Sequence, residues 1–242
     1  MSLIIGRKPV LEAINSGEAL EQVYLLYGQR GGIVDVIRIA AKKRGIKCNE
    51  ISKDKFETIV KNPNSQGVAA RKSFQKYYTP EEIIKRSKEK KYPLVVILDQ
   101  IQDPHNLGAI LRTAECSGVD GVFITKNNSA SVNDTVVKTS AGATEHIMMC
   151  VINNLSQLIT QLKENGFWII GSTLSDSVEY TTIDYKMPAA LIVGNEEKGI
   201  RKLTSDLCDH RIKIPMTGKI QSLNVSVATG ILLFEITRQR KN

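Results

Sequence analysis

The stretch from Ile214 to Arg240, IPMTGKIQSLNVSVATGILLFEITRQR, decides how the second part of the chain is interpreted. A short apolar strand ends near its first residues, and a glycine-containing loop follows. Ser222, Leu223 and Asn224 then open a long apolar helix, which Ser222 is expected to cap. Ligands bind at the carboxyl ends of the strands in an open α/β sheet. The stretch therefore predicts either a ligand-binding junction between a strand and a helix or an ordinary capped core helix.

Upstream of this stretch, short apolar runs alternate with segments of helical spacing. The runs LVVILD, GVFIT, IMMCVI, FWIIGS, ALIVGN and RIKIP are continuously apolar, which is typical of parallel strands covered on both faces. Helices are expected over Leu107–Cys116, Asn133–Ala143 and Leu155–Glu164 between them. The alternation predicts a doubly wound α/β domain over residues 92–242.

Residues 1–75 predict a smaller α/β unit that precedes this domain. Its expected helices are Arg7–Asn15, Ile33–Arg44 and Lys53–Val60, and its expected strands are Gln22–Tyr27, Lys47–Ile51 and Gly67–Arg71.

Residues 76–91 are predicted to link the two parts. Thr79, Pro80 and Glu82 form a capping box with proline at the first helical position, which starts a short charged helix. The helix is polar nearly all round and ends in KEKKYP, so it is expected to bridge domains.

The composition of the 242 residues, with 42% hydrophobic and 24% charged residues, is ordinary for a globular protein. No apolar run approaches the roughly 20 residues that span a bilayer. The N-terminus has no signal-peptide pattern, because Gly6, Arg7 and Lys8 interrupt it early, and a cytoplasmic protein is expected. The 4 cysteines form no C-x-x-C pair and the 3 histidines no H-x-x-x-H pair, so no metal site is expected.

The positive charge is concentrated in the front of the chain. Residues 1–91 contain 19 Lys and Arg against 10 Asp and Glu, whereas residues 92–242 contain 14 against 15. This asymmetry favours a basic part that recruits a phosphate backbone and a near-neutral part that performs chemistry. The alternative is that the lysines only keep a small domain soluble. The candidate phosphate contacts are Arg7, Lys8, Arg30, Lys42, Lys43, Arg44 and Lys72.

Two further stretches carry polar residues where strands end, LDQIQDPHNLGAILRTA at 98–114 and LIVGNEEKGI at 191–200. Together with the C-terminal stretch, and in this order, they resemble the three motifs of the SpoU (TrmH-like) RNA ribose 2'-O-methyltransferases of the SPOUT class. The opening GRKPVLEAI resembles the start of the substrate-binding domain of many such enzymes, a fold similar to RNA-binding ribosomal proteins. The best fit is to enzymes that methylate a guanosine of 23S ribosomal RNA.

The resemblance implies a deep trefoil knot in the C-terminal third of the chain, which is a rare exception to unknotted topology. It also implies a homodimer whose interface includes the last helix and the knot. The implied cofactor is S-adenosyl-L-methionine, and the implied partner is ribosomal RNA. No G-x-G-x-x-G and no Walker pattern is present, so NAD and ATP are poor cofactor candidates.

The resemblance places the cofactor against loops that follow three strands. Gly194, Ile214 and Leu223 are expected to lie at its adenine and ribose, and Thr173 with Ser172 is expected to complete the wall. Gly194 would allow a close backbone approach that a side chain would block. Taken alone, each of these residues is an ordinary turn glycine, strand end or loop residue.

The implied catalytic residues are Asn106, Arg112, Glu196, Ser222 and Asn224. Taken alone, Asn106 is an N-cap candidate. Arg112 interrupts an otherwise apolar helix, so it is expected to be buried with a partner, either a carboxylate such as Glu115 or Glu196 or a phosphate of the substrate. The family proposal makes this arginine a general base, but a guanidinium pKa above about 12 favours an anchor for a phosphate.

Three other functions remain open from the residues. One is methylation of a transfer-RNA guanosine or of an adenosine. Another is a non-catalytic RNA-binding factor in ribosome assembly, and the third is an unrelated α/β nucleotide-binding enzyme.

Overall fold

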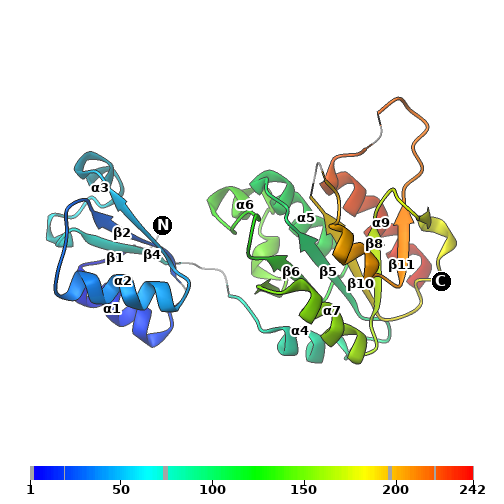
Figure 1. Cartoon of the computed structure of the whole chain (residues 1–242), viewed down its shortest axis with the longest axis horizontal. Helices are drawn as coiled ribbons and strands as arrows, with labels where there is room; N and C mark the ends of the chain where they lie inside the picture. The colour runs from blue at the N-terminus through cyan, green and yellow to red at the C-terminus, as the bar shows by residue number, and fades with distance from the viewer. Residues whose placement is uncertain (1–2, 19, 73–75, 196–197, 221, 242) are drawn as a thin grey trace. The chain divides into compact units, whose positions relative to one another are not determined.

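The computed structural model describes residues 3–18, 20–72, 76–195, 198–220 and 222–241. The chain forms two compact units, Met1–Lys76 and Tyr77–Asn242, and both are α/β structures (Figure 1). Among the described residues, no helix is both long enough and apolar enough to cross a membrane.

The first unit contains a four-stranded sheet in the order β1-β4-β2-β3, in which β4 runs in the opposite direction to the other three strands. Successive residues of β2 point to opposite faces, so Val23 packs under α1 and α2, whereas Tyr24 packs against Phe56 of α3. Helices therefore cover both faces of this sheet. The elements are β1 (Leu3–Ile5), α1 (Arg7–Ser16), β2 (Leu20–Leu26), α2 (Ile33–Lys43), β3 (Lys47–Ile51), α3 (Lys53–Ile59), the 3-10 turn η1 (Pro63–Ser65) and β4 (Val68–Lys72).

The second unit contains a seven-stranded sheet in the order β7-β6-β5-β10-β8-β11-β9, and every described pairing is parallel. The prediction of a parallel α/β sheet is confirmed, since each expected apolar run supplies one strand. The short edge strand β9 was not predicted. The strands are β5 (Leu94–Asp99), β6 (Gly121–Thr125), β7 (Met149–Ile152), β8 (Trp168–Ser172), β9 (Val178–Glu179), β10 (Ala189–Gly194) and β11 (His210–Lys213).

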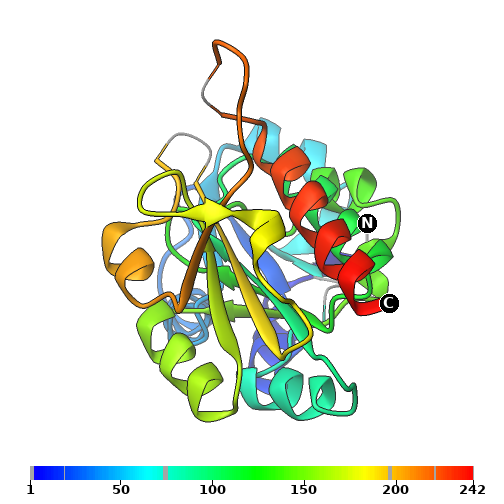
Figure 2. The same cartoon turned by 90° about the vertical axis from the view of Figure 1, so that its right-hand side faces the viewer.

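Helices cover both faces of this sheet, and Figure 2 shows α9 and α7 on opposite sides of it. One core packs Val96 and Leu98 of β5 against α5 and α9, and the other packs Val95 and Ile97 against α4 and α7. The helices are α4 (Pro80–Ser87), α5 (Pro104–Cys116), α6 (Asp134–Thr139), α7 (Leu155–Glu164), α8 (Lys202–Asp206) and α9 (Val225–Lys241), with 3-10 turns η2 (Ala143–Glu145) and η3 (Tyr180–Thr182).

The helix expected to bridge two domains belongs to the second unit. Its capping box is confirmed, because the Thr79 amide donates to the Glu82 carboxylate and the Glu82 amide donates to the Thr79 hydroxyl. Ile83 and Ile84 are buried against the sheet, and a Cβ at Gly121 would lie 2.4 Å from Ile83 Cγ2. Two adjacent isoleucines are therefore enough to dock a helix whose remaining surface is polar.

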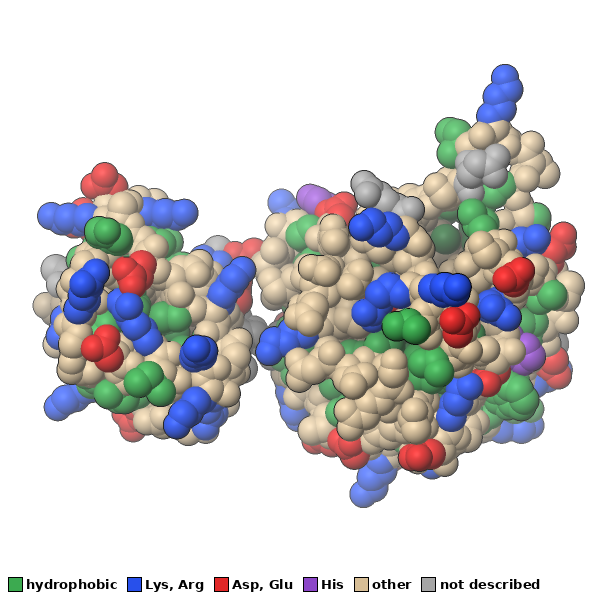
Figure 3. Space-filling view, viewed as in Figure 1, with side chains coloured by type: hydrophobic (Ala, Val, Ile, Leu, Met, Phe, Trp, Pro, Cys, Tyr) green, Lys and Arg blue, Asp and Glu red, His purple; other side chains and the backbone are tan. Residues whose placement is uncertain are grey.

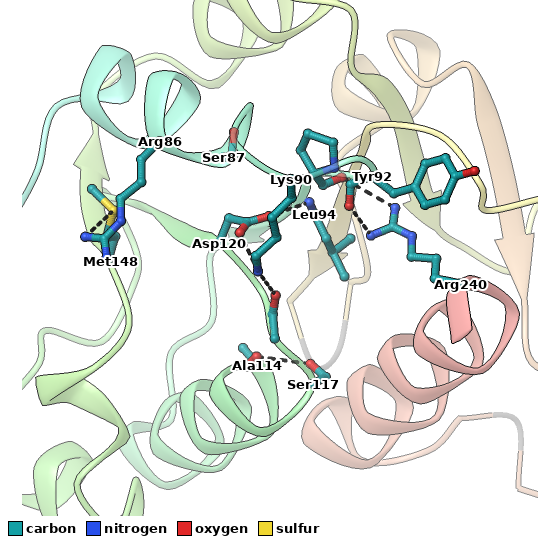
Figure 4. Close-up of polar contacts among 12 residues, drawn as sticks. Arg86, Ser87, Lys90, Tyr92, Leu94, Ala114, Ser117, Asp120, Met148 and Arg240 are labelled. Atoms are coloured by element: carbon teal, nitrogen blue, oxygen red, sulfur yellow. Dashed lines mark hydrogen bonds and ion pairs between the residues drawn. The ribbon is translucent and has the colours of Figure 1, made fainter. Parts of the chain in front are cut away.

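The C-terminal end of α9 is tied to the amino ends of the central strands (Figure 4). Arg240 donates hydrogen bonds to the carbonyl oxygens of Tyr92 and Pro93, which precede β5, and of Tyr185 and Met187, which precede β10. Burial lowers the pKa of Arg240 to about 10, so its guanidinium remains charged near neutral pH.

Two carboxylates cap strand starts at the same edge. Asp120 accepts the Leu94 amide at 2.8 Å and pairs with Lys90 at 2.6 Å (Figure 4). Asp209 accepts the Ile169 amide at 2.8 Å and pairs with Lys163 at 2.7 Å. The charged groups of this edge are thus used to hold backbone in place.

Candidate functional site

A cavity of about 340 Å³ lies at the carboxyl ends of β8, β10 and β11. Its volume falls within the range of small-molecule sites, which is roughly 300–1,000 Å³. It is lined by Ser172, Thr173, Leu174, Ser175, Val193, Gly194, Asn195, Lys198, Gly199, Lys213, Ile214, Met216, Ser222, Leu223, Val225 and Ala228.

Three parallel strands deliver residues to this cavity from distant parts of the sequence. Thr173 follows β8, Gly194 ends β10 and Ile214 follows β11, and the Thr173 amide donates to the Ile212 carbonyl at 3.0 Å. Leu223 and Ser222 approach from the loop before α9. All four residues assigned to the cofactor, together with Ser172 and Ser222, therefore surround one space.

Gly194 must lack a side chain because the backbone of its own loop packs against it. A Cβ at this position would lie 2.1 Å from the Gly199 carbonyl carbon and 2.2 Å from the Ile200 nitrogen. Asn195 and Gly199 close this turn by reciprocal backbone hydrogen bonds of 3.0 and 2.9 Å. The backbone that approaches Gly194 is thus that of its own loop, and a larger residue would displace the cavity wall.

Asn195 is a lining residue that the sequence analysis missed. Its side-chain amide donates to the Gln100 carbonyl at 3.0 Å, and its Oδ1 accepts the Lys198 amide at 3.1 Å. Asn195 thus connects the loop after β10 with the loop after β5. Its place between Gly194 and Glu196 in the motif was the available signal, since asparagine commonly fixes turns through its side chain.

Asn224 and Asn106 join the last helix to α5. The Asn224 Nδ2 donates to the Asn106 Oδ1 at 3.0 Å, and the Asn224 Oδ1 accepts the Ser226 amide at 2.9 Å. Asn224, rather than Ser222, therefore caps α9. The N-cap interpretation of Asn106 is also wrong, because Asp103 caps α5 by accepting the His105 amide at 2.9 Å.

Arg112 lies on the exposed side of α5, contrary to the expectation that it would be buried. The buried positions of this helix are Leu107, Gly108, Ile110, Leu111 and Ala114, and Arg112 falls outside the stripe that they form. It makes no hydrogen bond or ion pair with another described residue, and it is not among the described residues that line the cavity. Its guanidinium is therefore accessible to a partner outside this chain.

The remaining predicted residue, Glu196, lies outside the described residues.

Lys198 and Lys213 are two cations of the cavity wall that the sequence analysis did not single out. Lys213 was hidden in the strand run RIKIP, where its alternation with Ile212 and Ile214 was the available signal.

In the described parts of the chain, no three His, Cys, Asp or Glu side chains form a group that could hold a metal ion. The cysteines are free, and burial raises the pKa of both Cys150 and Cys208 to about 11. The polar groups around the cavity are therefore amides, hydroxyls and lysines.

Comparisons with known proteins cover nearly the whole chain. Residues 93–234 match the SpoU rRNA Methylase family, and residues 3–78 match the family described as RNA 2'-O ribose methyltransferase substrate binding. A putative TrmH family tRNA/rRNA methyltransferase from Staphylococcus epidermidis is 39% identical and aligns over 98% of this chain and 96% of its own length.

Solved structures share the architecture. An AdoMet-bound rRNA methyltransferase from Sinorhizobium meliloti is 29% identical with a TM-score of 0.64, over 98% of this chain and 86% of that one. The TrmH/SpoU tRNA modifying enzyme of A. aeolicus is 35% identical with a TM-score of 0.57, over 67% of this chain and 84% of that one. The resemblance seen in the three motifs is thus confirmed, and the chain belongs to the SpoU (TrmH-like) family of RNA methyltransferases.

Proposed function

We propose that the protein methylates the 2'-hydroxyl of a guanosine ribose in 23S ribosomal RNA, with S-adenosyl-L-methionine as the methyl donor. The observation that carries this proposal is the convergence of all three motifs at one edge of the sheet. Gly194, Ile214 and Leu223 line one cavity, and the Asn106–Asn224 hydrogen bond joins the first motif to the third.

The cavity suits a cofactor that has an apolar ring system and charged ends. Val193, Ile214 and Leu223 supply apolar surface, whereas Lys198 and Lys213 supply positive charge for a carboxylate. When bound, the cofactor supplies a methyl group on a sulfonium sulfur. The protein must then hold the ribose in line with that methyl group and remove a proton from the ribose 2'-hydroxyl.

Side chains outside the cavity orient the ribose hydroxyl, anchor a phosphate and accept the proton. Asn106 and Asn224 hold each other, and Asn224 can orient a hydroxyl through the second hydrogen of its Nδ2. The exposed Arg112 anchors a phosphate next to the target ribose. Loss of a proton from a guanidinium requires strong desolvation, and exposure of Arg112 therefore favours the anchor over the general base. We assign to Glu196 the positioning of Arg112 or acceptance of the proton, and to Ser222 the orientation of the ribose or of the cofactor carboxylate.

We assign RNA binding to residues 1–75 and chemistry to residues 92–242. Figure 3 shows lysine and arginine side chains spread over the visible face of the first unit. Lys8, Arg30, Lys42 and Lys43 are exposed and have no partner among the described residues, which leaves them to bind phosphates. By contrast, the other three candidates have partners: Lys72 pairs with Glu18 at 2.7 Å, Arg44 donates to the Asn15 carbonyl and Arg7 to the Gln66 carbonyl.

The presence of this front unit supports ribosomal RNA as the substrate. The S. meliloti rRNA methyltransferase aligns with 98% of the chain, whereas the A. aeolicus tRNA modifying enzyme aligns with 67% of it. A transfer-RNA guanosine is the second candidate, because that shorter relative has the higher identity, 35% against 29%.

We further propose a homodimer whose interface includes α9. Val227 is 51% exposed and Phe234 is 53% exposed on this helix, and their seven-residue spacing puts both on one face. Covering this apolar stripe with a second copy would remove it from water. Sedimentation equilibrium should show a dimer, and Phe234→Asp should shift it to the monomer.

We also propose that the C-terminal third is knotted and that the first unit has a fold similar to RNA-binding ribosomal proteins. The knot is supported by β10, which lies between β5 and β8, and by contacts of α9 with both α5 and the segment 183–187. When the unfolded chain is stretched from both ends, its maximum extension should be shorter than its full contour length if a knot tightens in it.

The test of the proposed function is methyl transfer from labelled S-adenosyl-L-methionine to unmodified large-subunit rRNA and, separately, to bulk transfer RNA. Wild type is compared with Asn106→Ala and Arg112→Ala, and the modified nucleoside is identified by mass. Arg86→Ala is the matched control, since this arginine is also exposed on a helix and its side chain contacts Met148 on the described part of the chain.

Label on a ribose-methylated guanosine of rRNA, lost in both variants and kept in the control, is the expected result. Label on transfer RNA alone would overturn the substrate and keep the chemistry. RNA binding without cofactor binding or label would instead favour an assembly factor. A near-wild-type rate for Arg112→Lys at raised pH would argue against the bidentate anchoring role.

A further inference from the structure

A second cavity lies at the carboxyl edge of the same sheet, over β5, β6 and β7. It measures about 220 Å³, and the proposed function does not use it. The loops after these three strands form it together with the start of α7 and of α8. Its lining residues are Gln100, Thr125, Lys126, Asn127, Asn153, Asn154, Leu155, Ser156, Arg201, Leu203 and Thr204.

The chemistry of this wall favours an anion. Among its described residues, Lys126 and Arg201 are charged and both are cations, whereas no carboxylate faces the cavity. Asn127, Asn153 and Ser156 add side-chain donors for oxygen atoms, whereas the Thr125 and Thr204 hydroxyls already donate to the Leu98 carbonyl and to Asp99. A neutral, apolar ligand would leave most of these groups without partners.

Arg201 is held in a fixed orientation by a carboxylate behind it. Asp99 is only 1% exposed, and its oxygens lie 2.9 Å from the Arg201 Nη2 and 3.1 Å from its Nε. This pair is close to electrically balanced, so Arg201 contributes directed donors more than net charge. The uncompensated positive charge therefore comes from Lys126, whose backbone is fixed by a 2.9 Å hydrogen bond to the Ile152 carbonyl.

The start of α7 adds backbone donors to the same wall. Asn154 caps this helix by accepting the Gln157 amide at 3.1 Å. The amides of Leu155 and Ser156 precede it in the first turn and have no partner among the described residues. Free amides at a helix start and the positive end of its dipole favour a phosphate at this point.

The two cavities are neighbours. Gln100 lines the second cavity, and its carbonyl accepts the side-chain amide of Asn195, which lines the first. The strand β5 lies between β6 and β10, so the ends of β6 and β10 are about 10 Å apart. A strand of RNA that presents one ribose at the first cavity can therefore reach the second with an adjoining part of its backbone.

We propose that the second cavity binds a phosphodiester group of the RNA strand close to the nucleotide that is methylated. This inference rests on the proposed function, since it assumes that the first cavity presents the methyl donor. Lys126 supplies the charge, the start of α7 supplies amide donors, and Arg201 supplies directed hydrogen bonds.

The test compares the KM for unmodified large-subunit rRNA in wild type, Lys126→Gln and Ser156→Asp. Lys126→Gln should raise this KM about tenfold, and the slope of log affinity against log salt concentration should fall by about 1. Ser156→Asp should raise the KM similarly, because its carboxylate repels a phosphate at the start of α7. An acidic residue in the first turn stabilises a helix, so the melting temperature should not fall.

Lys186→Gln is the matched control, because this exposed lysine precedes β10 and thus lies at the opposite edge of the sheet. Its KM for rRNA should equal that of wild type, and the affinity for S-adenosyl-L-methionine should be unchanged in all three variants. Calorimetric titration of wild type and Lys126→Gln with guanosine monophosphate shows whether the second cavity binds a free nucleotide instead of a phosphate of RNA.

An rRNA KM within twofold of wild type in both cavity variants would overturn the inference and leave the proposed function intact. Tight binding of the mononucleotide that depends on Lys126, with an unchanged rRNA KM, would also overturn it. If wild type methylates no RNA, the proposed function fails. The RNA-binding part of the inference is then tested by filter binding, where an unchanged affinity of Lys126→Gln for the same rRNA would overturn it.

Discussion

The two edges of the sheet in the second unit use their polar groups in opposite ways. At the amino edge, Arg240, Asp120 and Asp209 each bind backbone groups that start or precede a strand. At the carboxyl edge, the loops leave two cavities with lysines, amides and hydroxyls on their walls. The comparison shows that one edge fixes the fold and the other remains available to ligands, as expected for an open parallel sheet.

The sharpest test of this division is the Asn106–Asn224 pair at the carboxyl edge. Asn106→Ala removes one partner, and Asn224→Asp removes the amide donor while keeping the oxygen that caps α9. Each change should lower kcat/KM about 100-fold, because the proposed function assigns to this pair the orientation of the reacting hydroxyl. Steady-state rates with the RNA that wild type methylates provide the measurement.

The double variant distinguishes one bonded unit from two independent groups. Its loss should remain near that of either single variant, because each change already breaks the pair. Two losses that multiply would show that the asparagines act separately. A fall in melting temperature comparable to that of an amino-edge variant would place the pair among the structural contacts instead.

At the amino edge, Arg240→Ala should reduce stability rather than chemistry. Four carbonyl oxygens lose a charged donor, and a half-buried site can replace it only partly with water, so the cost should be about 2 kcal/mol. The melting temperature of the second unit should fall by roughly 4–8 °C. Arg238→Ala on the same helix should leave it unchanged, and equal effects of the two variants would refute the special role of Arg240.

A smaller effect is expected at Asp120, whose carboxylate accepts the first amide of β5. Asp120→Asn keeps an acceptor for the Leu94 amide and loses the attraction to Lys90, a lysine that is itself 53% exposed. The free energy of unfolding should fall by about 1 kcal/mol. Urea unfolding measures this change, and a variant as stable as wild type would mean that the amide contact alone holds the strand.

The smallest effect concerns the thiols and tests how tightly the amino edge is closed. Cys208 follows α8 and adjoins Asp209, and burial raises the pKa of its thiol to about 11. At pH 8, about one molecule in a thousand should carry this thiolate, and labelling should accelerate about tenfold per pH unit up to that pKa. The exposed Cys116 should label first, as peptide mapping can show.

Equal labelling rates at Cys116 and Cys208 at pH 8 would contradict closure of this edge. Faster labelling of Cys208 in Arg240→Ala would show that the anchor of α9 also protects the other side of the sheet.

Much of the architecture could be predicted from the sequence because the strands are long apolar runs. The range of β5 was predicted to the residue, and α7 was predicted with its full length. The strands β1 and β9 were missed, because pieces of three and two residues carry too little pattern. The placement of α4 was missed because its apolar stripe consists of only Ile83 and Ile84.

The candidate site was predictable in its membership but not in its contacts. The three motifs named Gly194, Ile214 and Leu223, which share one cavity. Burial of Arg112 was predicted from apolar neighbours in sequence, but a helix turns about 100° per residue and carries it out of the buried stripe. The Asn106–Asn224 bond joins positions 118 residues apart, and no local pattern can specify such a pair.

The order of the strands also has a consequence for how the protein is made. Strand β5 lies beside β10, which the ribosome adds only after β6, β7, β8 and β9. The wall formed by Ile214, Leu223 and Ala228 is synthesised later still, and Arg240, which binds the opposite edge, follows it in the chain. A growing chain therefore leaves one edge of β5 unpaired until β10 has been synthesised. The wall of the first cavity is thus completed only after every strand of the sheet has been synthesised.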